Sequence, residues 1–367
     1  MNPRDNADIQ DLSLKQVAHI KGLAICLMLL LHLFCTKDYR LYTSLLGVNN
    51  VPIEYYIGLF GDSCVAIFCF CSGFGLYKNF LNKKQDEYAE SNIKRIFYLY
   101  KNLWIIIFLF VFALPYFLSK RDVFDLSFSV LALSITGIDM TYNGAWWFFT
   151  VYIMLCLSSS FLFRFFEKWS AFKVVSLVFL IYILAYIQRI KVPIFFGLEF
   201  VDGVLRIIAL YGTSVFPFII GYLFAKYNFY PHILDCLKKN VGNKYLISFF
   251  GVGAVLCLII FHGYFQSLFW APLIMIVLIP SFTIIQKPLW LDSGLVFLGE
   301  HSTNIWLTHM FYYIYLFKEI VFYPRYSFFI FIWLLILSAT SSIIINKLRL
   351  LLENIFSDLK FFYERSR

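Results

Sequence analysis

Apolar runs about 20 residues long recur along the whole chain, separated only by short polar joints. The hydrocarbon core of a bilayer is about 30 Å thick, and a helix needs about 20 residues to cross it. Only 14% of the residues are charged, whereas a soluble domain usually has about 25%. The sequence therefore predicts an all-α, polytopic integral membrane protein.

By this length criterion we expect about ten transmembrane helices. They fall at residues 17–35, 57–77, 96–118, 145–163, 172–187, 207–225, 245–261, 265–285, 294–317 and 327–346. No long polar block or Ser/Pro/Gly-rich linker interrupts them, so residues 1–346 are predicted to form one membrane domain. Three aspartates precede the first run and no small-residue cleavage site follows it, which indicates a retained span and not a cleaved signal peptide.

The distribution of Lys and Arg predicts the orientation of these spans. Short loops rich in these residues stay on the cytoplasmic side. With the N-terminus inside, about two thirds of the 31 basic residues fall on the inner side. We therefore expect both termini in the cytoplasm. Topology also explains the formal charge of +9 better than a nucleic-acid partner does.

Residues 347–367 have the pattern of an amphipathic helix on the inner membrane surface. The apolar residues at helical spacing are Leu348, Leu351, Leu352, Ile355, Leu359 and Phe362. The eight cysteines form no CxxC pair and no Cys/His ligand spacing. We therefore expect no metal site and no required disulfide.

Lys21 and His32 lie at the two ends of an uncharged stretch in the first predicted span. Eleven residues apart on a helix, they fall within about 20° of one face and roughly 16 Å apart along the axis. Ionisable residues in a span are costly and mark functional sites by default. The alternatives are that Lys21 only anchors the helix at the interface and that His32 is a structural histidine.

A second histidine, His309, shares a face of the ninth predicted span with Ser302. In the predicted topology His309 reaches the same depth as His32, which suggests a common cavity. Other polar residues predicted at the site are Asp62, Ser72, Asn143 and Trp147, the last next to Trp146. Ordinary solvated histidines are expected at span ends or in loops, at His19, His232, His262 and His301.

These parts suit acyl transfer across a membrane. A buried histidine can take a proton from a hydroxyl as its oxygen attacks a carbonyl, and a low-dielectric site strengthens hydrogen bonds to the oxyanion. A cation nearer the cytosol can hold the anionic part of a cytosolic donor.

Six short segments, in order, resemble those of the membrane-bound acyltransferase family 3, which includes bacterial O-acetyltransferases of surface polysaccharides. They are HIKGLAICLMLLLHLF with Lys21 and His32, FCFCSGFGLY, NIKRIFYLYKN with Lys94 and Arg95, NGAWWFFTVY with Trp147, FPFIIGYLFAK, and FLGEHSTNIWLTHM with Gly299, Ser302 and His309. The family often has Arg where this chain has Lys21, and Arg where it has Asn92.

The resemblance implies a ten-helix acyltransferase of a bacterial cytoplasmic (inner) membrane that acetylates hydroxyls of cell-surface or lipid-linked glycans. Acetyl-CoA, or a related acyl-CoA, would be the donor substrate, with no metal. His32 would be the general base, with His309 and Ser302 positioning the acceptor or stabilising the transition state. Lys21, Lys94 and Arg95 would hold CoA.

A transporter with a His/Lys/Asp relay is the main alternative, followed by a structural membrane protein whose polar residues join helices. The glycan, the acyl group, the source and the oligomeric state are not indicated by the sequence.

Overall fold

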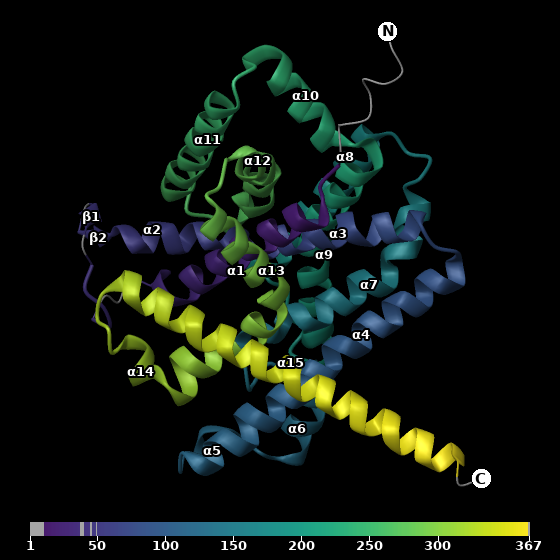
Figure 1. Cartoon of the computed structure of the whole chain (residues 1–367), viewed down its shortest axis with the longest axis vertical. Helices are drawn as coiled ribbons and strands as arrows, with labels where there is room; N and C mark the ends of the chain where they lie inside the picture. The colour runs from purple at the N-terminus through teal and green to yellow at the C-terminus, as the bar shows by residue number, and fades with distance from the viewer. Residues whose placement is uncertain (1–10, 37–39, 45, 49, 366–367) are drawn as a thin grey trace. The chain divides into compact units, whose positions relative to one another are not determined.

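The computed structural model describes residues 11–36, 40–44, 46–48 and 50–365. It confirms the all-α fold, with one two-stranded antiparallel hairpin among the described residues, β1 (Gly47–Val48) and β2 (Val51–Pro52). The α-helices, labelled in Figure 1, are α1 (Leu14–Phe34), α2 (Ile53–Phe60), α3 (Cys64–Leu81), α4 (Gln85–Ile107), α5 (Leu114–Phe117), α6 (Phe128–Ile135), α7 (Trp147–Phe165), α8 (Ala171–Tyr186), α9 (Glu199–Tyr227), α10 (Phe229–Val241), α11 (Lys244–Tyr264), α12 (Ala271–Ile284), α13 (Leu289–Met310), α14 (Lys318–Phe322) and α15 (Ser327–Arg365).

Short 3₁₀ and π-helical segments extend several of these helices. The 3₁₀ segments used below are η1 (Gly61–Ser63), η4 (Gly144–Trp146) and η6 (Leu268–Trp270), and the π-helical ones are η2 (Phe108–Ala113), η5 (Ile187–Lys191) and η7 (Phe311–Leu316). Each joins an α-helix end to end, so the apolar stretches run longer than the α-helices alone.

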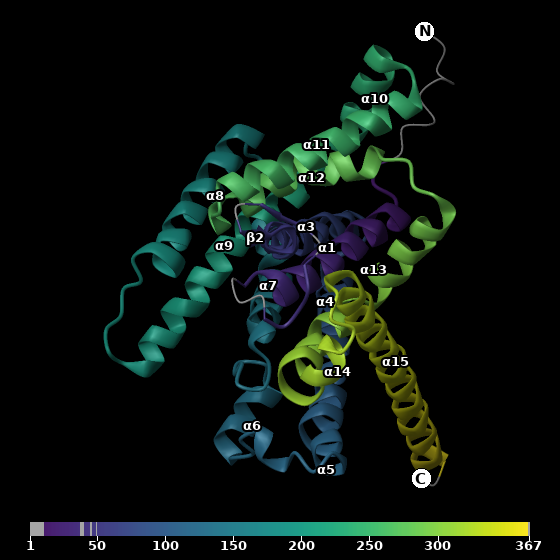
Figure 2. The same ribbon diagram turned by 90° about the vertical axis from the view of Figure 1, so that its left-hand side faces the viewer.

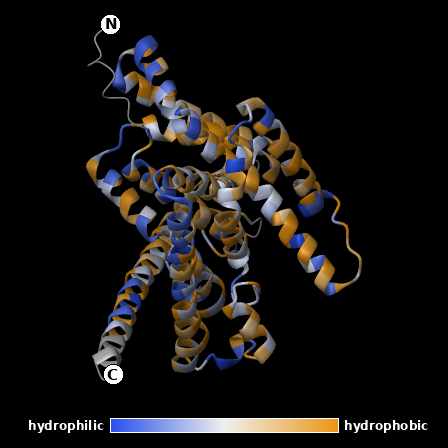
Figure 3. Ribbon diagram, turned by 90° about the vertical axis from the view of Figure 1, so that its right-hand side faces the viewer, coloured by the Kyte–Doolittle hydropathy of each residue, from blue (hydrophilic) through white to orange (hydrophobic). Residues whose placement is uncertain are grey.

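Eight helical segments of the described chain are long and apolar enough to cross a membrane. They are Leu14–Phe34, Ile53–Leu81, Gln85–Phe117, Gly144–Phe165, Ala171–Lys191, Glu199–Tyr227, Lys244–Tyr264 and Ser327–Ile355, and Figure 3 shows hydrophobic residues over most of the helical ribbon. The other two predicted spans are also helical. The segment Leu268–Ile284 is shorter, and α13 carries Asp292, Glu300 and two histidines. The count of ten spans and the cytoplasmic termini stay predictions.

The described residues fall into two compact units. The first unit combines Met1–Lys37, Leu46–Asn92 and Val151–Glu300, and the second combines Asp38–Leu45, Ile93–Thr150 and His301–Arg367. Some residues used in the sequence argument lie outside the described chain: Arg4, Asp5, Asp8, Lys37 and Arg367.

In the first unit, α3 and α9 cross at two glycines that the family motifs contain. A Cβ atom on Gly73 would lie 1.9 Å from the Phe218 carbonyl oxygen, and one on Gly221 would lie 2.1 Å from that of Phe70. Small residues let membrane helices approach this closely. The motifs SGF and FIIGYL therefore position α3 against α9, and Figure 2 shows α8 lying beside α9.

The first helix is held by a similar crossing and by a polar cap. A Cβ atom on Gly22 would lie 2.3 Å from the Leu295 oxygen, and one on Gly299 would lie 2.0 Å from the Ala18 oxygen. At the N-terminus of α1, Ser13 forms a capping box with Gln16. The start of the Lys21–His32 segment is thus fixed against the first half of α13, and its later part packs on α2 and η1.

In the second unit, buried amides join three helices. Asn102 of α4 donates to the Asn304 oxygen at 2.8 Å, and Asn304 of α13 donates to the Asn346 oxygen of α15 at 3.0 Å. Asn102 and Asn304 are buried, and amides in membrane helices bond across helices in this way.

The C-terminal segment is helical as predicted, but it continues α15 without a break through residue 346. The side chains of Leu359 and Phe362 lie outside the described residues. The domain boundary at residue 346 and the membrane-surface position of this tail stay predictions.

Candidate functional site

Helix α1 carries the predicted donor and catalytic residues on one face. It is unbroken from Leu14 to Phe34, so the angular argument for Lys21 and His32 applies directly. Both side chains are half-buried, and His32 lies in the last turn. Within the described part of the chain Lys21 makes no ion pair, whereas Lys15 and Lys78 each pair with an aspartate.

Three basic side chains lie near Asp292 at the start of α1. Lys15 Nζ lies 2.6 Å and His19 Nε2 lies 3.1 Å from the carboxylate oxygens of Asp292. The hydrogen bond from Lys15 is the main reason why the pKa of Asp292 is lowered. Burial lowers the pKa of the nearby Lys287 to about 8, although Asp292 opposes this shift. Two basic side chains thus contact one carboxylate, and a third lies near enough to act on it electrostatically.

This cluster corrects the sequence prediction for His19. We expected a solvated histidine, but only 8% of His19 is exposed and its ring contacts Asp292. The same holds for His262, near the end of α11, which is fully buried. Its Nε2 lies 3.2 Å from Oδ2 of Asp62, which is in η1. A carboxylate and an imidazole are therefore buried together in the first unit.

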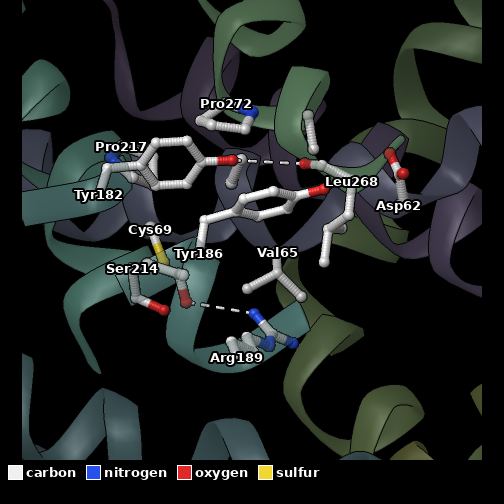
Figure 4. A pocket seen from close by; sticks show the side chains of 13 residues that line it. Asp62, Val65, Cys69, Tyr182, Tyr186, Arg189, Ser214, Pro217, Leu268 and Pro272 are labelled. Carbon is white, nitrogen blue, oxygen red and sulfur yellow. Dashed lines mark hydrogen bonds between the residues drawn. The ribbon is translucent and has the colours of Figure 1, made fainter. Parts of the chain in front are cut away.

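Asp62 also lines a recess between η1, α3, α8, α9 and α12 of the first unit. About 380 Å³ in the recess is not filled by protein atoms, part of it open to the surroundings. Figure 4 shows Tyr182, Tyr186 and Arg189 reaching it from α8 and η5. Arg189 donates to the Thr213 hydroxyl at 3.1 Å. The recess thus combines both signs of charge with hydroxyl groups and aromatic rings.

In the second unit, His309 is fully buried and its tautomer is fixed by a backbone contact. Its Nδ1 lies 2.7 Å from the Trp306 carbonyl oxygen. A carbonyl can only accept, so Nδ1 carries the proton and the lone pair of the neutral ring lies on Nε2. The imidazole stacks on Tyr313 with ring centroids 6.0 Å apart. His309 can therefore accept a hydrogen bond through Nε2.

The segment before α7 is fastened to α13 around this histidine. Asn143 Nδ2 and Trp146 Nε1 both donate to the Leu307 carbonyl oxygen, at 2.9 Å and 3.1 Å. Trp306 Nε1 donates in return to the Ala145 oxygen at 2.9 Å. Asn143, which we predicted to bind substrate, is fully buried here. These contacts show it supporting the turn that carries His309.

The remaining predicted residues have different surroundings. Ser302 is 4% exposed, and Trp147 is half-buried with its ring edge against Phe148. Ser72 donates to the Phe68 carbonyl oxygen one turn earlier in α3, at 2.8 Å. None of these contacts tests a substrate-binding role.

Lys94 is exposed and Arg95 half-buried on α4 in the second unit. Asn92, where the family often has its first Arg, is 5% exposed and donates to the Cys156 carbonyl oxygen in the first unit. Two turns after Lys94, Lys101 pairs with Glu353 of α15 at 2.9 Å. An amide thus occupies a buried position where the family usually has a cation.

Sequence reasoning missed Arg189, which lines the recess, and His262, which contacts Asp62 beside it. We placed His262 at a span end, and Arg189 comes just after the predicted span 172–187. Both residues are ionisable and lie beside an apolar span. The same criterion identified Asp62 and could have identified His262 and Arg189. Pairing across α2, α8 and α11 cannot be read from spacing within one helix.

The helices and their buried ionisable residues define a polytopic membrane protein with intramembrane polar sites. A family model described as an acyltransferase domain, Acyl_transf_3, matches residues 14–347. This is most of the chain, which therefore belongs to the membrane-bound acyltransferase family 3, as its motifs predicted. No curated protein and no solved structure gives a significant match. The chain is a membrane acyltransferase, and the match does not favour the transporter alternative.

Proposed function

We propose that the chain transfers an acetyl group from cytoplasmic acetyl-CoA to a hydroxyl of a cell-surface or lipid-linked glycan, in the cytoplasmic membrane of a bacterium. The observation that carries the proposal is the unbroken α1, within the matched residues, which presents Lys21 and His32 on one face. A cation and an imidazole roughly 16 Å apart on that face suit a donor at one end and the reaction at the other.

In this proposal His32 is the general base. It takes the proton of the acceptor hydroxyl as the oxygen attacks the thioester carbonyl carbon of the donor. The new C–O bond forms, the C–S bond breaks, and the CoA thiolate leaves with the proton that the imidazolium returns. One imidazole thus serves both steps, and no metal is needed.

The cations of α1 and α4 support the donor assignment. Lys21 makes no ion pair within the described chain, so its charge is available for a phosphate of CoA. Lys15 and Lys287 add positive charge near the start of α1. We assign Lys21, Lys94 and Arg95 to CoA.

His309 and Ser302 are assigned to the acceptor. With Nδ1–H bonded to the Trp306 oxygen, neutral His309 accepts through Nε2. It can therefore orient a hydroxyl group of the acceptor. In its neutral form Nε2 carries no proton, so it cannot donate a hydrogen bond to an oxyanion. The common cavity of His32 and His309 stays a prediction.

The decisive experiment replaces His32 by Ala. We expect acetyl transfer to fall by about 100-fold or more, because general bases contribute factors of that order, while expression and membrane insertion persist. Mass spectrometry of surface glycans from cells with the wild-type or variant protein reports the acyl mass and the sugar position together.

His232→Ala is the matched control, because His232 is exposed on α10 and should leave acetylation unchanged. Wild-type acetylation in His32→Ala would remove His32 from catalysis. If cells that contain the protein and cells that lack it have identical surface glycans, this would instead argue against a glycan acceptor.

A further inference from the structure

The recess of the first unit contains a buried carboxylate oxygen that the fold itself does not use. Asp62 Oδ2 faces His262, but Oδ1 has no hydrogen-bond partner among the described residues. The side chain is only 9% exposed and lines the recess. A buried polar atom without a partner is costly, so this oxygen is suited to accept a hydrogen bond from a ligand.

The same recess presents a cation held in place by its surroundings. Arg189 lines it from η5 and donates to Thr213, which fixes one nitrogen of the guanidinium. Arg206 of α9 is near enough to affect Arg189 electrostatically. A guanidinium binds carboxylate or phosphate through two parallel hydrogen bonds. The recess can therefore bind an anionic group at this side.

Two tyrosines complete the lining, as Figure 4 shows. Tyr182 donates to the Phe269 carbonyl oxygen at 2.9 Å, and the Tyr186 hydroxyl lies 2.9 Å from that of Ser267. These bonds fix the rings, which have apolar faces and polar tips. Such surfaces suit a ring that bears both C–H groups and hydroxyls.

We propose that this recess binds an anionic sugar residue of the acceptor, with Arg189 on its carboxylate or phosphate and Asp62 on one of its hydroxyls. The inference rests on the glycan acceptor proposed above and adds the class of sugar. The ends of α8 and α11 also lie on the side that we predict to be extracytoplasmic.

Equilibrium binding to the purified full-length protein, without acyl donor, tests the proposal. The probes are D-glucuronic acid, D-glucose 6-phosphate and D-glucose. We expect the wild type to bind both anionic sugars at least about tenfold more tightly than glucose, as a charge-assisted pair provides. Arg189→Gln should reduce their binding to the level of glucose, and Arg189→Lys should keep part of the preference.

Asp62→Asn should weaken all three sugars, because the hydroxyl contact is common to them. Arg121→Gln is the control, since it removes a cation that stacks on Tyr116 in the second unit and should change nothing. Size-exclusion elution and thermal unfolding identify any variant that fails to fold. The preference of the wild type for anionic sugars over glucose can be measured without any variant.

Equal binding of glucose and glucuronic acid by the wild type, or a preference that survives in Arg189→Gln, overturns the proposal. Displacement by phosphatidylinositol vesicles at lower concentration than by the free sugars would assign the recess to a lipid headgroup, which also overturns the glycan assignment. Because no donor is present, loss of sugar binding is distinct from loss of transfer in His32→Ala.

Discussion

At the scale of single residues, the two lysines of α1 differ in whether they form an ion pair. Lys15 is paired with Asp292, whereas Lys21 has no ion pair within the described chain. If Lys21 binds a phosphate of CoA, Lys21→Ala should raise the dissociation constant of acetyl-CoA about tenfold or more, the value of one charged hydrogen bond. Binding to the detergent-solubilised protein measures this directly.

Lys21→Arg provides a second readout, because the family often has Arg at this position. It should restore the affinity, while Lys15→Ala, which removes a charge already shared with Asp292, should have a smaller effect. An unchanged affinity in Lys21→Ala would leave Lys21 as an interfacial anchor of α1.

The sequence identified ionisable residues inside spans, but not their partners. Asp62 stands out because a carboxylate in an apolar run is costly. His262 lies 200 residues further along the chain and meets Asp62 only through the packing of α11 beside α2. Its position near a span end resembled that of a solvated histidine. Predicting such pairs requires the order of the helices in space, which periodicity does not give.

At the scale of helices, the family motifs serve largely as crossing points. Gly73 and Gly221 each meet the backbone of the opposite helix, and Gly22 and Gly299 do the same between α1 and α13. The sequence motifs contain these glycines, but the motif pattern alone provides no physical reason for glycine at these positions. The structure provides it, because helix backbones can come this close only where the side chain is absent.

Gly221→Val should therefore destabilise the first unit. Its Cβ would lie 2.1 Å from the Phe70 oxygen, and overpacking costs about 1–3 kcal/mol or more. Gly203→Val, on the same helix α9, is the matched control, since a Cβ there meets no atom within 4 Å. Thermal unfolding of the purified variants measures the difference, and equal midpoints would contradict the crossing argument.

Apolarity predicted where the helices lie better than where they end. The spans at 145–163 and 245–261 agree closely with Gly144–Phe165 and Lys244–Tyr264. In contrast, α4 begins at Gln85 and α15 continues to Arg365, well beyond the apolar stretches. Polar residues extend these helices because intrahelical hydrogen bonds do not need an apolar environment. The hydrophobic pattern therefore indicates which part of a helix lies in the bilayer, and not where the helix begins and ends.

For the whole molecule, the donor and acceptor assignments both depend on the orientation of the chain in the membrane. Acetyl-CoA is a cytoplasmic compound in our proposal, so the end of α1 near Lys21 must face the cytosol. Among the eight cysteines, Cys236 and Cys257 are exposed. Cys257 lies within the apolar α11, whereas Cys236 lies on the polar α10, beside Lys238 and Lys239. Cys236 is therefore the natural reporter of this side.

A membrane-impermeant maleimide should label Cys236 in inverted vesicles and not in intact cells. Cys236→Ser should abolish this labelling. Cys35, at the far end of α1, should react slowly from the other side, because burial and the nearby Asp62 raise the pKa of its thiol, and only the thiolate attacks. The labelling rate of Cys35 should increase as the pH is raised towards the pKa of its thiol. The comparison is therefore made in a Cys35→Ser background, which has no labelling at this position. Labelling of Cys236 in intact cells would reverse the orientation and place Lys21 away from any cytoplasmic donor.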